Sequence, residues 1–157
     1  MKLITIAILI LTTSLFSNDL KITSDKFSGD QKNGISIFTG HVNMLNGNDE
    51  LNASKVIIYT DSKNQPTKMI GKSNVSFRIK TQKGFSYVGK AQKIVYFPKK
   101  KEYQFFNSVY IKQENSSKEI IGERVKINTV EGTAYAEGRD SEPVVMVFKL
   151  PSKDEEK

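Results

Sequence analysis

The segment Ile35-Ser-Ile-Phe-Thr-Gly-His-Val-Asn-Met44 decides the fold class. Its apolar side chains stand on odd positions before Gly40 and on even positions, Val42 and Met44, after it. Because the side chains of a β-strand alternate between two faces, this pattern predicts a strand with one buried face. One extra residue at Gly40 would restore that face, as a β-bulge does, and glycine is the residue expected there.

The same alternation recurs along the chain. Val75-Ser-Phe-Arg-Ile-Lys80 is apolar at every odd position, and odd positions again carry the apolar face within 102–112. Segments 56–59, 94–97 and 144–148 are apolar on both faces, which predicts strands that are covered twice or lie at a contact edge. Turn-forming residues separate nearly all of these segments, and no window of a dozen residues has helical spacing. The sequence therefore predicts an all-β fold.

An internal repeat indicates how the strands are organised. The triplets Val42-Asn-Met44, Val75-Ser-Phe77 and Val109-Tyr-Ile111 recur 33 and 34 residues apart. Each is followed by a quartet of the form small-x-basic-aliphatic: Ala53-Ser-Lys-Val56, Ala91-Gln-Lys-Ile94 and Gly122-Glu-Arg-Val125. Repeats of this length indicate a stacked unit, here a pair of strands, whose apolar face must be covered by its neighbours. We expect a folded-over sheet with a long apolar interior.

Composition removes several classes of function. The 157 residues include 24 basic and 17 acidic side chains, one histidine and no cysteine. The lack of cysteine excludes disulfides, thiolate nucleophiles, iron–sulfur clusters and Cys-ligated zinc. A single histidine, His41, excludes a multi-His metal site. We therefore expect one domain without a metal site or a cofactor.

The N-terminus has the layout of a secretory signal peptide. Met1-Lys2 is followed by the apolar run Leu3–Leu11 and then by small and polar residues. We expect cleavage near Ser17, although a retained membrane anchor stays an alternative; a spanning helix needs about 20 apolar residues. The predicted organisation is a signal peptide at 1–17, one domain at 18–150 and a charged tail at 151–157.

Catalysis and nucleic-acid binding find little support in the residues. The carboxylates of Asp49, Glu50, Asp61 and Glu131 lie in or beside predicted turns without a recognisable catalytic spacing. We expect no catalytic residue and no enzyme, and an envelope enzyme that uses Asp49 or Glu50 is the alternative. Aromatic and basic residues could stack nucleic-acid bases. These aromatics fall on the inward phase of the strands, however, and we expect no nucleic-acid partner for an exported protein.

Three stretches carry a family resemblance: Ile22-Thr-Ser-Asp-Lys26, Ile37-Phe-Thr-Gly-His-Val42 and Leu51-Asn-Ala-Ser-Lys-Val56. They resemble the LptA/OstA-like family of periplasmic lipopolysaccharide-transport proteins, and the similarity extends from about Leu20 to Phe148. The resemblance implies a twisted open β-jelly roll of antiparallel strands. It also implies a periplasmic protein that shields lipid A acyl chains in a groove. Head-to-tail stacking would bridge an LptC-like inner-membrane protein and an LptD-like outer-membrane translocon.

The apolar side chains that are predicted to face inward on the strands would line such a groove. The predicted lining residues are Ile35, Ile37, Val42, Met44, Val75, Phe77, Tyr87, Tyr103, Phe105, Val109 and Ile111. At ~0.8 kcal/mol per buried methylene, a dozen-carbon chain gains on the order of 10 kcal/mol, whereas an exposed lysine–phosphate contact gives about 1 kcal/mol or less. Lys99, Lys100 and Lys101 are therefore predicted to make only a weak headgroup contact. The pattern alone favours an ordinary closed core, and it is the resemblance that implies an open, lipid-accepting groove.

Assembly needs free strand edges, because a head-to-tail contact between two different edges propagates. The first strand, about Leu20 to Phe27 and including Ile22, is one predicted assembly edge. The other is the last strand, formed by Val144, Val145, Met146, Val147 and Phe148. Two alternatives stay open: an LptC-like protein anchored in the inner membrane, and a closed β-barrel carrier of a small lipid that does not self-associate.

Overall fold

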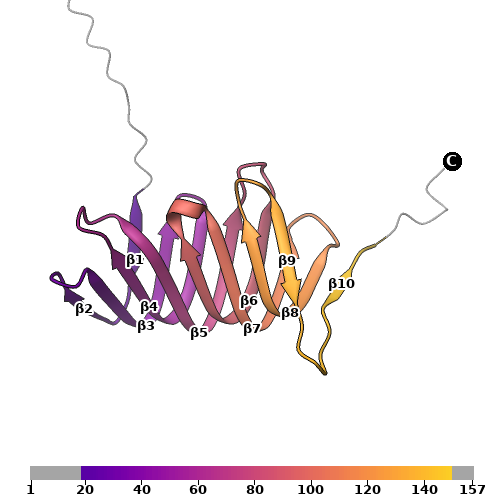
Figure 1. Cartoon of the computed structure of the whole chain (residues 1–157), viewed down its shortest axis with the longest axis horizontal. Coiled ribbons are helices and arrows are strands. Elements are labelled where there is room, and N and C mark those ends of the chain that lie inside the picture. Colours follow the sequence, from indigo (N-terminus) through magenta and orange to yellow (C-terminus); the bar gives the residue numbers. More distant parts are fainter. Residues whose placement is uncertain (1–18, 150–157) are drawn as a thin grey trace, which may run out of the picture.

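The computed structural model describes residues 19–149, and nearly all of them lie in antiparallel strands (Figure 1). The strands are β1 (Leu20–Thr23), β2 (Lys26–Asp30), β3 (Ile35–Asn46), β4 (Asp49–Thr60), β5 (Pro66–Lys80), β6 (Ser86–Phe97), β7 (Glu102–Gln113), β8 (Glu119–Asn128), β9 (Thr133–Glu137) and β10 (Val145–Val147), and a 3-10 helix, η1 (Pro98–Lys100), joins β6 to β7. The predicted signal peptide at 1–17, its cleavage near Ser17 and the tail at 151–157 lie outside the described residues. Within 19–149, no helix is long and apolar enough to cross a membrane.

The ten strands form one sheet that is folded over into two halves. The strand order is β1-β3-β4-β5-β6-β7-β8-β10, and in addition β2 pairs with β3 and β9 pairs with β8. The six long strands β3 to β8 bend at a corner and contribute to both halves. Half A comprises β1, β10 and residues 42–53, 75–91 and 109–122; half B comprises β2, β9 and residues 35–39, 55–72, 93–106 and 124–132. This architecture confirms the predicted all-β, open antiparallel fold.

The corner is built from pairs of residues in the left-handed region. Gly40-His41 on β3, Ser73-Asn74 on β5 and Asn107-Ser108 on β7 all have positive φ, and each pair opposes a single residue of a neighbouring strand. The extra residue bends the strand, as in a β-bulge. A side chain at position 40 would overlap the carboxylate of Asp25, so glycine is required there. The position of the predicted bulge at Gly40 and the 33–34-residue repeat are both confirmed, but the bulge does not move the buried face of β3 from odd to even positions as predicted.

The repeated quartets fill the inside of the corner. The small residue of each quartet pairs with the valine of a repeated triplet: Val42 with Ala53, Val75 with Ala91 and Val109 with Gly122. Small side chains fit here because the two halves converge on the bend. The aliphatic fourth residue of each quartet is buried on half B, three positions after the small residue that faces inward on half A. Since side chains on one face of a strand are two positions apart, the inward-facing positions of β4, β6 and β8 shift by one residue at the corner.

The predicted phase of β3 before Gly40 is wrong. Phe38 pairs with the fully buried Val56 and packs against the core, so even positions face inward on this part of the strand. Ile35 and Ile37 therefore lie on the outer face of half B and do not line the interior. The reason is that the corner on β3 contains two residues, so even positions face inward both before and after it. The change from odd to even inward positions takes place on β4 instead.

The ends of the sheet also differ from the sequence prediction. The expected first strand, Leu20 to Phe27, is two strands, because each half has its own edge strand. The last strand is Val145–Val147, shorter than the expected 144–148, and β9 forms the matching edge of half B. In the described part of the chain, β1, β2, β9 and β10 each pair with one neighbour only. The sheet does not close, so a closed β-barrel is excluded.

Candidate functional site

The space between the two halves is the candidate site. Of the predicted lining, Val42, Met44, Val75, Phe77, Tyr103, Phe105, Val109 and Ile111 are buried in one core, and Tyr87 packs against it. They come from β3, β5, β6 and β7 and face one another across the fold. The structure thus gathers these residues in one apolar interior, and it leaves out only Ile35 and Ile37.

Sequence reasoning missed more than half of this interior. The further buried members are Leu51, Ala53, Val56, Ile58, Met69, Ile79, Ala91, Ile94, Tyr96, Val125 and Ile127. Most of them belong to β4, β6 and β8, where the inward phase shifts at the corner. Segments 56–59 and 94–97 are apolar at every position, so alternation could not select their inner face. The small residue of each quartet was the signal that could have fixed the phase.

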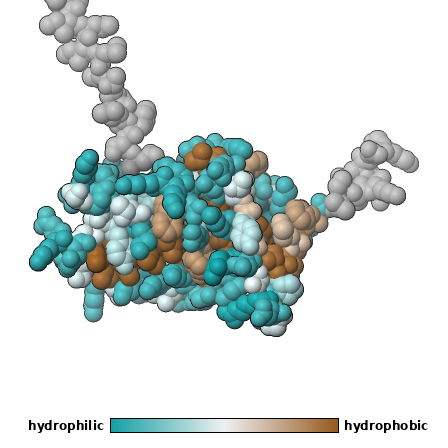
Figure 2. All heavy atoms as spheres, in the orientation of Figure 1, coloured by the Kyte–Doolittle hydropathy of each residue, from teal (hydrophilic) through white to brown (hydrophobic). Residues whose placement is uncertain are grey.

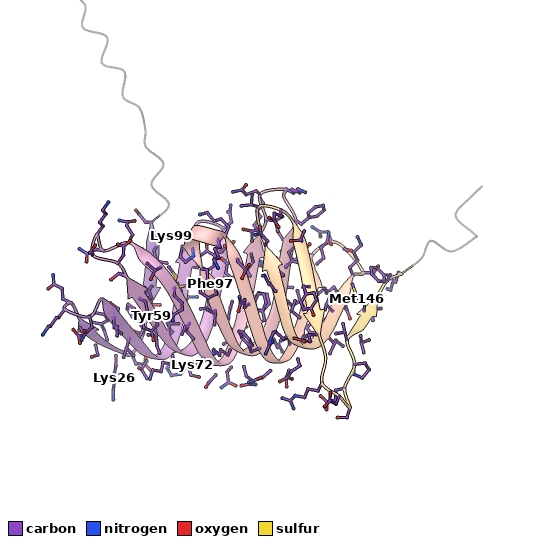
Figure 3. All side chains as sticks on the ribbon, in the orientation of Figure 1. Lys26, Tyr59, Lys72, Phe97, Lys99 and Met146 are labelled. Atoms are coloured by element: carbon purple, nitrogen blue, oxygen red, sulfur yellow. The ribbon has the colours of Figure 1, made fainter. Side chains whose placement is uncertain are left out.

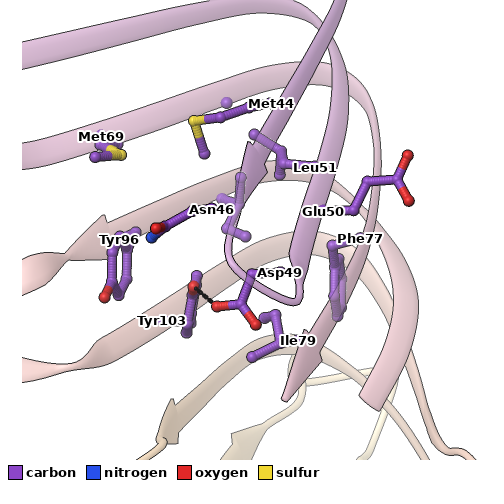
Figure 4. Close-up of a pocket in the computed structure, with 12 residues that line it drawn as sticks. Met44, Asn46, Asp49, Glu50, Leu51, Met69, Phe77, Ile79, Tyr96 and Tyr103 are labelled. Atoms are coloured by element: carbon purple, nitrogen blue, oxygen red, sulfur yellow. Dashed lines mark hydrogen bonds between the residues drawn. The ribbon is translucent and has the colours of Figure 1, made fainter. Parts of the chain in front are cut away.

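The two halves are in direct contact along the interior. The rings of Phe77 on half A and Phe105 on half B stack across the fold with centroids 4.3 Å apart. Within half B, the rings of the cross-strand partners Tyr96 and Tyr103 stack with centroids 4.2 Å apart and extend this aromatic contact. A cavity of about 20 Å³ remains beside them, lined largely by apolar side chains (Figure 4). One water needs ~10–15 Å³, whereas a cavity that binds benzene measures about 150 Å³. The protein's own side chains thus fill the interior, and an acyl chain fits only when the halves separate.

One polar bond crosses this apolar interior. The Tyr103 hydroxyl of half B donates to Asp49 Oδ2 of half A at 2.6 Å (Figure 4). The Lys80 amide donates to the other oxygen, Asp49 Oδ1, at 2.9 Å. Burial, together with the charge of Asp49, holds the pKa of Tyr103 far above the ordinary tyrosine value. Tyr103 therefore stays a neutral donor, and the bond ties the halves together.

We expect Tyr103→Phe to lower the free energy of unfolding by about 1.5–3 kcal/mol, the usual size for a hydrogen bond to a charged group. The pH dependence follows from the raised pKa of Tyr103: its stabilisation is complete below the unfolded pKa of about 10 and is lost as pH rises above it. Urea unfolding between pH 7 and 11 measures both effects. The wild type should lose stability more steeply above pH 10 than the variant, and parallel curves would contradict this role.

The mouth, where the turns of the two halves meet opposite the corner, is held by few bonds. The Gln82 amide donates to the Thr129 carbonyl at 3.1 Å, and Lys83 Nζ donates to the Glu131 carbonyl at 3.1 Å. Beside them lies a polar hollow lined by Asn46, Gly47, Asn48, Asp49, Lys80, Thr81, Gln82, Tyr96, Lys101 and Thr129. These contacts are hydrogen bonds at the surface, so separation of the halves at the mouth breaks little.

The three lysines predicted to contact a headgroup lie in different environments. Lys101 lines the polar hollow at the mouth. Lys99 pairs with Asp61 at 3.6 Å, and Lys100 lies over the Phe97 ring at 5.7 Å from its centroid. Of the three, only Lys101 is thus placed beside the interior.

The carboxylates considered for catalysis make structural contacts. Asp49 holds Tyr103, Glu50 accepts a hydrogen bond from Asn43 at 2.9 Å, and Asp61 accepts the amides of its own turn. His41 Nδ1 lies 2.7 Å from a carboxylate oxygen of Asp25 at the exposed corner. Among residues 19–149, no three acidic or histidine side chains gather as a metal site would require.

Within residues 19–149, the apolar interior is uncovered at both ends of the sheet. At one end Phe27 of β2 pairs with Phe38, faces inward and is 64% exposed. At the other end Met146 of β10 pairs with Ile120, which packs against the core, and is 52% exposed (Figure 3). Large apolar side chains at open ends indicate contact with something else.

An antiparallel sheet folded over an apolar interior, uncovered at both ends and edged by unpaired strands, defines an open β-jelly roll. A family model described as "LptA/(LptD N-terminal domain) LPS transport protein" matches residues 21–133, and the chain belongs to this family. Its fold is similar to the crystal structure of LptH, the LptA-homologous periplasmic component of the lipopolysaccharide transport device from Pseudomonas aeruginosa. The TM-score is 0.75 at 15% identity, with 85% of this chain and 96% of that chain covered. A search of curated proteins gives no match.

Proposed function

We propose that this protein binds lipopolysaccharide in the periplasm and shields its lipid A acyl chains between the two halves of the sheet. The observation that carries the proposal is the apolar interior, which runs through both halves and is uncovered at Phe27 and Met146. Family membership supports the same cargo. Burial of methylenes at ~0.8 kcal/mol each supplies the affinity, and Lys80 and Lys101 at the mouth offer cations to headgroup phosphates.

Entry of an acyl chain requires the halves to separate, because the cavity between them measures about 20 Å³. The corner offers the hinge: on three strands the bend lies at two residues of positive φ without a regular ladder. The mouth offers the opening, since a handful of polar contacts joins the halves there. Acyl chains then take the place of the contacts between the halves.

We further propose that copies of the chain stack head to tail. The strands β1 and β2 at one end and β9 and β10 at the other have unpaired edges within the described residues. Pairing the edges of one copy with those of the next would align the interiors into one conduit. The ends of such a stack would meet an LptC-like inner-membrane protein and an LptD-like outer-membrane translocon, after removal of the signal peptide at 1–17.

Site-specific photocrosslinking in cells tests the cargo and its place. A photoreactive phenylalanine analogue at Phe27 or Phe77, both on the inner face, should crosslink to lipopolysaccharide. The same analogue at Ser76, the neighbour of Phe77 on the outer face of half A, is the matched control and should give little product. Equal crosslinking from positions 76 and 77, or none from 27 and 77, would refute binding in the interior.

A further inference from the structure

The two outer faces of the folded sheet differ in character. The outer face of half A is polar, and two of its cations are paired with carboxylates: Arg78 with Glu114 at 3.0 Å and Lys112 with Glu119 at 3.9 Å. The outer face of half B has ion pairs toward β8 and β9, Arg124 with Glu137 at 3.2 Å and Lys126 with Glu102 at 3.1 Å, but over β3 to β6 it differs from half A. Its centre is apolar, and most of its cations lack a carboxylate partner within the described residues.

An apolar stripe crosses the outer face of half B. Ile37, Ile57, Ile70 and Val95 are direct partners on the four neighbouring strands β3 to β6. Two residues further toward the turns of half B, the outer face carries Ile35 on β3, Tyr59 on β4 and Phe97 on β6. We call these seven residues the outer stripe. Most of them are half-buried, and they include Ile35 and Ile37, for which the alternation along β3 predicts an inward position.

Cations flank the outer stripe on both sides. On the corner side Lys55, Lys72 and Lys93 are direct cross-strand partners. On the turn side lie Lys68, Lys99 and Lys100, and Lys99 alone of these six has an ion-pair partner in the described residues, Asp61. Like charges directly opposite one another destabilise a sheet. A row of three unpaired lysines thus opposes folding, and two of its members occupy the basic position of the repeated quartets.

The figures show the arrangement from outside, with half B toward the reader. Lys26 and Lys72 lie along one margin, Tyr59 and Phe97 lie toward the middle, and Lys99 lies at the opposite margin (Figure 3). Hydrophobic residues form a band across this face between hydrophilic margins (Figure 2). Lys68 Nζ stands 4.4 Å above the centre of the Tyr59 ring, so an aromatic ring and a cation meet where the stripe ends.

We propose that the outer face of half B docks on the surface of a lipid bilayer that carries anionic phospholipid headgroups. Lysine stems can lie along apolar surface while their ammonium groups reach phosphates, and an apolar patch rimmed by lysines is suited to an anionic interface. The same face of a second copy fits poorly, because the row Lys55, Lys72 and Lys93 would then meet like charges. The proposal goes beyond cargo transport and is independent of it, since it uses the face opposite to the interior.

Vesicle flotation with the exported chain tests the proposal. At low salt the protein should float with vesicles of phosphatidylcholine and phosphatidylglycerol in equal amounts, and at least about tenfold less with phosphatidylcholine alone. The triple variant Lys55→Gln/Lys72→Gln/Lys93→Gln should lose this preference. Because the variant removes like-charge repulsion, its urea midpoint should be equal to or above that of the wild type.

The matched control is Lys21→Gln/Lys90→Gln/Lys118→Gln, which makes the same change in net charge on half A and should keep binding to anionic vesicles. Equal losses in the two triple variants would mean that net charge alone drives binding, and would overturn the proposal. So would a wild-type protein that ignores anionic vesicles. In that case an acidic protein is the partner that the same face would fit.

Discussion

Joining the two halves by an engineered disulfide, Gln82→Cys with Thr129→Cys, is expected to abolish lipopolysaccharide binding when oxidised and to restore it on reduction. The Gln82 amide and the Thr129 carbonyl lie 3.1 Å apart across the mouth, so the two backbones are close enough for a bridge. No native cysteine competes. With the mouth locked, the interior keeps a cavity of about 20 Å³ and cannot admit an acyl chain.

The measurement is the affinity for lipopolysaccharide of the same protein with and without reductant, where a loss of at least about tenfold is expected from excluded methylenes. The disulfide should also stabilise the fold by ~2–4 kcal/mol, which rules out unfolding as the cause of the loss. The control is Gln113→Cys with Lys118→Cys, a pair bonded at 3.0 Å within half A. If the oxidised Gln82–Thr129 variant binds normally, the acyl chains bind elsewhere.

The sequence predicts the strands better than it predicts their faces. Alternation is unambiguous in 75–80 and 102–112, and the structure buries the expected side of both. The alternation misleads at Ile35 and Ile37. On β3, β5 and β7 the corner has two residues, so inward-facing positions keep the same odd or even number on both sides of it. On β4, β6 and β8 the corner has one residue fewer, so the inward-facing positions change between odd and even there. The alternation within one strand does not tell which residues of the neighbouring strand face inward. The change of face on β4, β6 and β8 is therefore visible only in how the strands pair.

The segments that are apolar on both faces have a common explanation in the structure. In 56–59 and 94–97 one face belongs to the interior and the other to the outer stripe. In 144–148 the explanation is different, because this segment ends the sheet and is largely exposed. In 56–59 and 94–97 the apolar pattern thus marks strands with both faces shielded from water, whereas in 144–148 it marks an exposed edge.

Whether the interior is filled or open could not be predicted from the pattern. A closed core and a lipid groove need the same inward residues, and the difference lies in how far the two halves approach. That distance is set by contacts between residues far apart in sequence, such as Phe77 with Phe105 and Asp49 with Tyr103. The sequence signal for them is weak, since aromatic and acidic residues are common at many positions.

Ending the chain before Pro143 is expected to turn head-to-tail assemblies into folded monomers. The change removes β10, which pairs only with β8 in the described residues and leaves an unpaired edge for the next copy. The fold should survive, because Val145, Met146 and Val147 are each at least 42% exposed and add little to the core. The removal uncovers Ile120 and Ile121 on β8, but it takes away the strand that would pair with the next copy.

Static light scattering across a concentration series measures the result, with circular dichroism to verify that the β-sheet is retained. The average molar mass of the wild-type protein should rise with concentration, whereas that of the shortened chain should stay at the mass of one copy. A chain that ends after residue 149 keeps β10 and is the matched control, expected to assemble like the wild type. A second variant, Val145→Lys with Val147→Lys, keeps the length but places charges on the outward side of the edge strand. Since both changes act on the same edge, assembly that persists in both would place the contact between copies elsewhere, on half B or on β1.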